Sequence, residues 1–351
     1  MRRLWLAAVM LALAVASAAC AAGGAAGDPG DGSASAAPQQ GAAPAGDTGG
    51  KDEASAGGED ADKSSQGNAK STVYPLTVQD ADGQTLTFDQ APQRIVSVSP
   101  AETEILFALG LGERIVGVSD YDDYPEEAMA KPKMGGIVTP NEEAILSAAP
   151  DLVIGGISLD EQAAGRLREL GLKLYRTNPK TLDDVIANIL QIGIITDAQG
   201  RAEEAAAAMR EDIRTVTEAV ARITEEERKR VYAEFSPGWT VGSGEFLDEL
   251  IRLAGGVNIA GDTEGWNRVD EEKVIRDDPE VILYAAGLTD FDSGKALEEL
   301  IKSRGGWSGI TAIREGRLIP LDMNIMVRPG PRLTQALQEI ARGLYPELFE
   351  Q

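Results

Sequence analysis

Short apolar segments alternate with helical patterns along most of the chain, and this order predicts an α/β fold. Residues 94–98 (Arg-Ile-Val-Ser-Val) are mainly apolar and β-branched, so they predict a buried strand. Ile105, Leu106 and Leu109 then lie on one face of a predicted helix that ends at Gly110. A second apolar segment, 115–118, completes a β–α–β unit whose strands should be parallel with a right-handed crossover.

The first half of the globular sequence contains further elements of the same kind. Residues 73–88 alternate between apolar and polar around Asp82 and Gly83, which predicts a β-hairpin. Residues 99–102 and 139–142 each predict a helix start with a capping box and with proline at the first helical position. Further strands are predicted at 151–155 and 172–175, and further helices at 142–149 and 161–170.

Two long helical patterns occupy the middle of the chain. Residues 178–195 are apolar at helical spacing, and residues 202–227 are rich in Ala, Glu and Arg without Gly or Pro. At ~1.5 Å per residue, a continuous helix over the second segment would span roughly 35–40 Å. Such a helix is long enough to link two lobes.

The remaining sequence repeats the strand–helix scheme. Segments 142–154 and 271–283 share an acidic helix start, a proline before an acidic residue, and an apolar strand. We therefore expect two α/β lobes with parallel sheets, 73–197 and 229–351, joined by residues 198–228. Second-lobe strands are predicted at 231–235, 278–284 and 317–321, and helices at 245–254, from 270, at 307–313 and at 332–344.

The N-terminal residues predict an export signal and a tether. Residues 1–20 carry a cationic start, an apolar run and small residues before Cys20, as in a secretory signal peptide. Cys20 after Ser-Ala-Ala resembles the lipidated cysteine of a bacterial lipobox, and simple signal cleavage is the alternative. Residues 21–72 are rich in Ala, Gly, Ser and Asp, which predicts a disordered tether. We expect a lipid-anchored protein on the outer face of the cytoplasmic membrane.

Charge and composition disfavour several function classes. Acidic groups outnumber basic groups 57 to 33, giving a formal net charge of −24, whereas nucleic-acid binding requires a basic surface. The chain has no histidine, which removes Ser-His-Asp and Cys-His sites and the usual zinc sites. Asp120, Asp122 and Asp123 could do acid–base work or bind a cation, but no nucleophile and base accompany them. We expect no catalysis, no metal site and no cofactor.

Five segments carry a family resemblance: 94–110, 116–125, 141–154, 242–260 and 269–283. They resemble the solute-binding lipoproteins of ABC importers for cobalamin and ferric siderophores, and the resemblance extends from about Val73 to Gln351. It implies two Rossmann-like lobes joined by one long helix, with a ligand in a cleft between them. It also implies an ABC-transporter permease dimer as the partner. We expect a monomer.

The resemblance implies a docking residue on each lobe. In this family a glutamate on the outer surface of each lobe binds basic residues of the permease, and the matching positions are Glu143 and Glu272. The adjacent Glu142 and Glu271 are alternatives. A glutamate in the first turn is also explained by the helix dipole alone.

Ligand-binding residues are expected in the loops that follow the strands. Flat aromatic rings there could pack against a large planar ligand, and each ring could equally serve as hinge or core packing. The candidates are Ser99, Pro100, Tyr121, Trp239, Trp266, Tyr284 and Arg328.

Two ligand classes are the main competitors. Tyr121 and Trp266 resemble aromatic residues that line the corrin cleft of vitamin B12-binding members, which favours a cobalamin-type corrinoid. Ile137 and Gly155-Gly156 stand where such members carry tryptophan. Arg328 could attract an anionic ferric siderophore, or could instead bind loop carbonyls. Haem is less favoured because no histidine can ligate its iron, although a tyrosine could. A surface receptor or an enzyme is the rival class.

Overall fold

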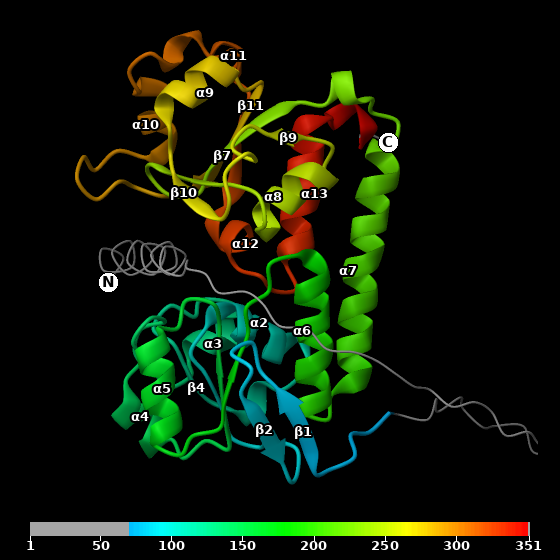
Figure 1. Cartoon of the computed structure of the whole chain (residues 1–351), viewed down its shortest axis with the longest axis vertical. Coiled ribbons are helices and arrows are strands. Elements are labelled where there is room, and N and C mark those ends of the chain that lie inside the picture. The colour runs from blue at the N-terminus through cyan, green and yellow to red at the C-terminus, as the bar shows by residue number, and fades with distance from the viewer. Residues whose placement is uncertain (1–69, 350–351) are drawn as a thin grey trace, which may run out of the picture. The chain divides into compact units, whose positions relative to one another are not determined.

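Two parallel β-sheets organise the chain into two lobes (Figure 1). The computed structural model describes residues 70–349, so the predicted signal peptide, Cys20 and nearly all of the predicted tether lie outside the described residues. The first sheet has the strand order β4-β3-β5-β6 and the second β12-β11-β7-β9. The two orders are equivalent when the second sheet is read from β9 to β12. Across each sheet, the strands then come in the order second, first, third and fourth along the chain. The predicted fold class is therefore confirmed.

All strands within these two sheets are parallel, and two antiparallel pairs lie outside them. The first sheet contains β3 (Ile95–Ser97), β4 (Ile115–Val118), β5 (Leu152–Gly155) and β6 (Leu174–Arg176). The second contains β7 (Arg230–Glu234), β9 (Val257–Asn258), β11 (Val281–Ala286) and β12 (Leu318–Asp322). The pairs are the predicted hairpin β1 (Leu76–Gln79) with β2 (Thr85–Phe88), and β8 (Trp239–Val241) with β10 (Trp266–Arg268). The β8–β10 ribbon was not predicted.

The helices cover the sheets and follow the predicted order. The first lobe has α2 (Pro100–Ala108), α3 (Glu126–Met129), α4 (Glu142–Ser147), α5 (Glu161–Glu169) and α6 (Leu182–Ile195). The second has α8 (Phe246–Leu253), α9 (Glu271–Asp277), α10 (Leu297–Ser303), α11 (Thr311–Arg314), α12 (Met323–Val327) and α13 (Leu333–Leu344). Helices α3, α10 and α12 were not predicted.

Helix α7 (Gln199–Val220) connects the lobes, as predicted (Figure 1). Its 22 residues span about 33 Å, and it packs against α6 and α2 on one side of the connection and against α13 and α8 on the other. Its buried positions recur at helical spacing. The predicted C-terminal end was wrong. Thr224 and Glu227 form a separate capping box that opens a 3₁₀ turn at Glu225–Glu227. The proposed lobe boundaries stay a prediction.

The first sheet is buried on both faces. Ile95 and Leu152 belong to the large core that continues into the second lobe, whereas Val96 and Val153 belong to a smaller core under α4 and α5. Successive residues of a strand point to opposite faces, so these continuous apolar runs are those of a covered parallel sheet. Loops follow the carboxyl ends of the strands, and ligands bind at this edge of the sheet in such folds.

Both predicted capping boxes of the first lobe are wrong. Ser99 is the N-cap of α2, but its side chain makes no capping hydrogen bond within the described part of the chain. Glu102 is instead buried and accepts a hydrogen bond from Thr177, which β6 brings beside it. Helix α4 begins two residues after Pro140, because Asn141 is its N-cap and accepts from the Ala144 N–H.

Candidate ligand-binding and docking sites

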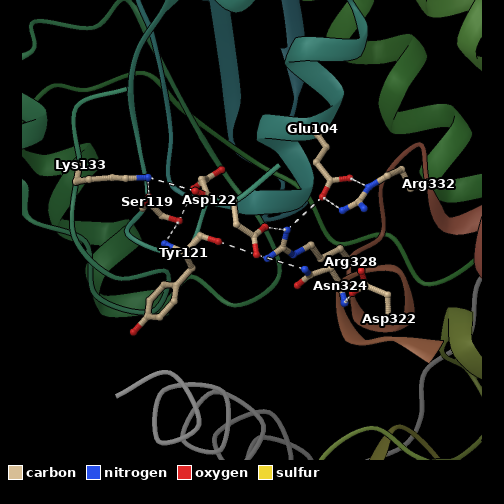
Figure 2. A network of polar contacts seen from close by, with 10 residues as sticks. Glu104, Ser119, Tyr121, Asp122, Lys133, Asp322, Asn324, Arg328 and Arg332 are labelled. Atoms are coloured by element: carbon tan, nitrogen blue, oxygen red, sulfur yellow. Dashed lines mark hydrogen bonds and ion pairs between the residues drawn. The ribbon is translucent and has the colours of Figure 1, made fainter. Parts of the chain in front are cut away.

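A polar network joins the second lobe to the start of the first (Figure 2). Arg328, at the C-terminal end of α12, donates to Asp123 Oδ1 at 2.6 Å, Glu104 Oε1 at 3.2 Å and the Tyr121 carbonyl at 3.3 Å. Arg332 donates to both oxygens of Glu104, at 2.8 and 2.6 Å. Asn324 donates to Asp123 at 3.3 Å. We call Glu104, Asp123, Asn324, Arg328 and Arg332 the interlobe network.

The charges of the interlobe network balance. Two guanidinium groups face two carboxylates, and Arg328 and Glu104 are only 8% and 3% exposed in their side chains. A buried charge must be paired, so these contacts account for the positive charge of Arg328. Arg328 thus lies beside Tyr121, and its guanidinium is already bound to the first lobe.

Arg332 adds an aromatic contact to the same junction. Its guanidinium lies 3.9 Å from the centroid of the Tyr124 ring, within cation–π distance. This contact was not predicted from the sequence. Tyr124 is 45% exposed, so the ring also faces solvent.

Two buried carboxyl groups lie at the carboxyl ends of the first-lobe strands. Glu102 accepts from Thr177 Oγ1 at 2.5 Å, and Asp122 accepts from Ser119 Oγ at 2.5 Å. Burial raises the pKa of Glu102 and of Asp122 above the usual carboxyl range, because the charged form loses its hydration. The Lys133 ammonium group donates to the carbonyls of Ser119 and Asp122 (Figure 2).

The other first-lobe candidates lie around these carboxyl groups. Ser99 is half-buried and Pro100 is buried at the first position of α2. Tyr121 is half-buried in the loop after β4, and burial raises the pKa of its hydroxyl, with Asp120 adding to the effect. A side chain at Gly156 would collide with Ser99 and Glu102, so glycine allows the loop after β5 to approach them.

The second-lobe candidates Trp239 and Trp266 share the β8–β10 ribbon. Trp239 pairs with Arg268 in the antiparallel register, and the Arg268 guanidinium lies 4.8 Å from the Trp239 ring centroid. The Trp266 ring contacts Phe235 and Phe246 edge to face, with centroids 4.8 and 5.5 Å away. Trp239 is 6% exposed, whereas Trp266 is half-buried. Trp239 lies on a strand rather than on the predicted loop.

A second contact between the lobes lies near Trp266. Lys180, after β6, donates to Glu245 Oε1 at 2.6 Å, and the Leu182 N–H donates to Glu249 at 2.6 Å. A Cβ on Gly265, the residue before Trp266, would lie 3.9 Å from the same Glu245 oxygen. Trp266 therefore directly follows a residue that lies near Glu245, and Glu245 binds the first lobe through Lys180.

Tyr284 lies apart from both groups. It is on β11, is 7% exposed, and donates its hydroxyl to Glu298 of α10 at 3.0 Å. Burial and the neighbouring Glu298 raise its pKa to about 12. These contacts lie within the second lobe, and none of the described contacts joins Tyr284 to Trp239, Trp266 or Arg328.

The predicted docking glutamates occupy equivalent helix positions. Glu143 and Glu272 are the second residues of α4 and α9, and both are exposed. Their neighbours are paired: Glu142 accepts from Arg166 at 2.6 Å, and Glu271 lies 3.4 Å from Arg304. Neither Glu143 nor Glu272 forms an ion pair or hydrogen bond through its side chain with residues 70–349.

Sequence reasoning missed Glu104 and Arg332, which hold the junction, and it did not foresee that Asp122 is buried. The available signal was the pair Glu102 and Glu104 in an otherwise apolar helix, because both face the interior and acidic residues are rarely buried without partners.

Three further features of residues 70–349 concern metal binding, membrane crossing and cavities. No group of three or more His, Cys, Asp or Glu side chains in this part could hold a metal ion. No helix in the same part combines the length and apolarity needed to cross a membrane. A cavity of about 40 Å³ lies beneath the β8–β10 ribbon, lined by Thr240, Asn267 and Lys273 among others. It is large enough for water only.

Comparisons with known proteins agree with this architecture. An uncharacterized ABC transporter substrate-binding lipoprotein of Bacillus subtilis is 32% identical over 296 residues, covering 82% of this chain and 91% of the relative. The vitamin B12-binding protein of Vibrio cholerae is 30% identical over 259 residues, covering 72% and 89%. The crystallised periplasmic heme-binding protein of Roseiflexus sp. RS-1 has a TM-score of 0.64 and 30% identity, covering 73% of this chain and 99% of that one.

The family model for the periplasmic binding protein matches residues 95–324, from the first strand of one lobe to α12 of the other. This span includes both parallel sheets, α7 and most of the interlobe network. Its members bind solutes for ABC importers rather than transform them. The chain therefore belongs to the periplasmic binding protein family.

Proposed function

We propose that the chain captures a cobalamin-type corrinoid outside the cytoplasmic membrane and delivers it to the permease of an ABC importer. The ligand would lie between the loop that carries Tyr121 and the β8–β10 ribbon that carries Trp266. Two flat rings on opposite lobes suit a large macrocycle, because rings add contact area at a small cost in conformational entropy.

The neutralised Arg328 is the observation that carries the choice of a corrinoid. An anionic ferric siderophore would need a cation in the site, and Arg328 was the candidate for that role. Its bonds to Glu104 and Asp123 supply its counter-charge within the protein. A ligand without strong negative charge does not require this arginine.

A ferric siderophore stays the second candidate because of Arg268. This side chain is exposed, lies over the Trp239 ring, and makes no ion pair with the described residues. It could supply the positive charge that Arg328 does not. The heme-binding relative makes haem a third ligand to be tested.

The test is a calorimetric titration of the full chain with cyanocobalamin, with haem, and with a ferric hydroxamate siderophore. One-to-one binding of cyanocobalamin alone supports the proposal. Binding of the siderophore alone, with loss of affinity in Arg268→Gln and not in Thr263→Gln in the loop before β10, would establish the alternative instead.

Glu143 and Glu272 are the proposed contacts with the permease dimer. Both are exposed and unpaired within residues 70–349, while the adjacent Glu142 and Glu271 are bound to arginines of their own lobes. The free carboxylates suit basic residues of a partner better than the paired ones do. We also propose that Cys20 carries the lipid that keeps the protein beside the membrane.

A further inference from the structure

The helices α4 and α9 belong to two corners that match residue by residue. Asn141 and Asp270 cap the two helices, each accepting from the N–H three residues on, at 3.1 and 3.0 Å. Ile145 and Val274 are the buried anchors, at 0% and 4% exposure. Each residue of the first corner is separated from its counterpart in the second by the same number of positions. The match therefore extends without a gap from the capping residue to the strand that follows the helix.

The C-terminal ends of the two helices are held by the same device. Arg94 donates to the carbonyls of Ala148 and Ala149, and Arg230 donates to those of Asp277 and Asp278. Ala149 and Asp278 both have left-handed backbone conformations, with φ of 45° and 42°. Arg94 directly precedes β3 and Arg230 begins β7, and these are the first strands along the chain of the two parallel sheets.

This device fixes how each helix presents its outer face. The left-handed region is unfavourable for an L-residue, so neighbouring contacts must maintain that conformation. The arginines satisfy carbonyls that the short helices leave unpaired. Both helices are thereby held firmly on their sheets, although each has only six or seven residues.

One turn after each docking glutamate stands an exposed aliphatic side chain. Leu146 follows Glu143 by three residues and is 41% exposed, and Ile275 follows Glu272 by three residues and is 42% exposed. Residues three apart are neighbours on a helix surface. Each lobe therefore presents a carboxylate beside an aliphatic group, and we call these pairs the acidic–aliphatic patches.

We propose that Leu146 and Ile275 are the apolar anchors of permease docking, each entering a pocket beside the basic group that binds its glutamate. This rests on the proposed function. A patch repeated on two similar lobes fits a partner that presents the same surface twice, as a permease dimer does. An anionic lipid surface is a poor partner, because the chain carries a net charge of −24 and each patch adds a carboxylate.

The two components of each patch should act differently. Opposite charges across an interface mainly speed association and weaken with salt, whereas a buried aliphatic anchor mainly slows dissociation and is insensitive to salt. The glutamates would therefore select and orient the permease, and the aliphatic side chains would hold it.

The experiment measures binding of the full chain to the importer's permease–ATPase complex in nanodiscs, at low and high salt. The double change Leu146→Asn, Ile275→Asn should weaken binding about 30-fold at both salt concentrations, through faster dissociation. The double change Glu143→Gln, Glu272→Gln should instead reduce the salt dependence. The matched control is Leu170→Asn, Val257→Asn, at positions 44% and 42% exposed outside the patches, and it should leave binding unchanged.

The outcomes separate this inference from the proposed function. If the unaltered chain does not bind the complex, the proposed function fails and the patches fail with it. If it binds and the Leu146, Ile275 variant binds equally well, or the control loses as much, only the anchor assignment fails. Binding to empty anionic nanodiscs that the Leu146, Ile275 variant loses would assign the patches to lipid and overturn the proposal.

Discussion

At the corners that carry α4 and α9, the two lobes hold equivalent residues in equivalent contacts. At the carboxyl ends of their sheets, the same lobes differ. The first lobe places the buried carboxyl groups of Glu102 and Asp122 there, whereas the second places Trp239 and Trp266 on an added antiparallel ribbon. The strand order is the same in both, so the difference comes from the loops.

This comparison separates two kinds of recognition. The proposed permease dimer would offer two equivalent surfaces, and the lobes carry matching patches for it. A small molecule has no such repeat, so the two edges that face it can differ in chemistry. The interlobe network belongs to neither kind of surface. It joins Arg328 and Arg332 of the second lobe to Glu104 on α2 of the first.

The largest expected effect comes from removing Glu104. Glu104→Ala would leave Arg332 without its main partner and Arg328 with one carboxylate, so the free energy of unfolding should fall by about 3–5 kcal/mol in urea denaturation. The matched control is Glu218→Ala, which removes an exposed partner of Arg214 on α7 and should cost about 0.5 kcal/mol or less. Equal losses in both variants would mean that the network does not stabilise the junction.

The docking glutamates provide the next test, because they belong to the part in which the lobes are alike. Glu143→Arg with Glu272→Arg should leave ligand affinity unchanged and lower uptake at least about 10-fold, since like charges would meet at the permease. Uptake by cells carrying the variant, compared with titration of the purified protein, measures both effects.

The control for this charge reversal is Glu126→Arg with Glu226→Arg, which makes the same charge change at exposed positions elsewhere. Its uptake should match that of the unaltered chain. Normal uptake in the docking variant would remove Glu143 and Glu272 from the interface.

Trp266 tests the part in which the lobes differ. Trp266→Ala should weaken binding of cyanocobalamin about 10-fold without unfolding the protein, because the half-buried ring offers one face to a ligand. Phe107→Ala, at a half-buried aromatic position near the C-terminal end of α2 and outside the loops that follow the strands, is the control. Unchanged affinity in the Trp266 variant would exclude this tryptophan from the site.

Glu102 gives the smallest expected effect. Its pKa is raised on folding, so the folded protein binds more protons than the unfolded chain and stability falls as pH rises from the usual carboxyl range. Glu102→Gln keeps an acceptor for Thr177 and removes the buried charge. We expect it to raise the free energy of unfolding at neutral pH by roughly 1 kcal/mol, and to reduce the loss of stability as pH rises above the usual carboxyl range.

Glu127→Gln, at an exposed position, is the control. It should change neither the free energy of unfolding nor its dependence on pH. Denaturant titrations over the pH range make the comparison. If the Glu102→Gln variant lost stability at neutral pH, Glu102 would not be a buried acid whose charged form destabilises the fold.

Much of the fold could be predicted because it depends on local pattern. The strand at 94–98, the helix after it and the long α7 follow from apolar periodicity and from residues that start or end helices. The repeated layout of 142–154 and 271–283 also indicated two similar lobes, and the sheets share one strand order. The β8–β10 ribbon escaped prediction because its strands are three residues long and carry no alternation.

The roles of single polar residues depended on neighbours distant in sequence. Glu102 has the spacing of a capping box, but in the folded chain its carboxyl group accepts a hydrogen bond from Thr177, which follows β6. Arg328 carries a charge that sequence alone left available, and Glu104 and Asp123, more than 200 positions earlier, bind it in the folded chain.

The sequence by itself determined the fold class and the linking helix, because periodicity and helix capping act over a few residues, whereas the family resemblance alone suggested the docking role of Glu143 and Glu272. Only the tertiary structure decided which charges are neutralised, which aromatic rings are packed, and that Leu146 and Ile275 stand exposed in matching places. The physical reason is that burial and ion pairing are properties of the assembled lobes, set by contacts between segments that the chain order keeps far apart.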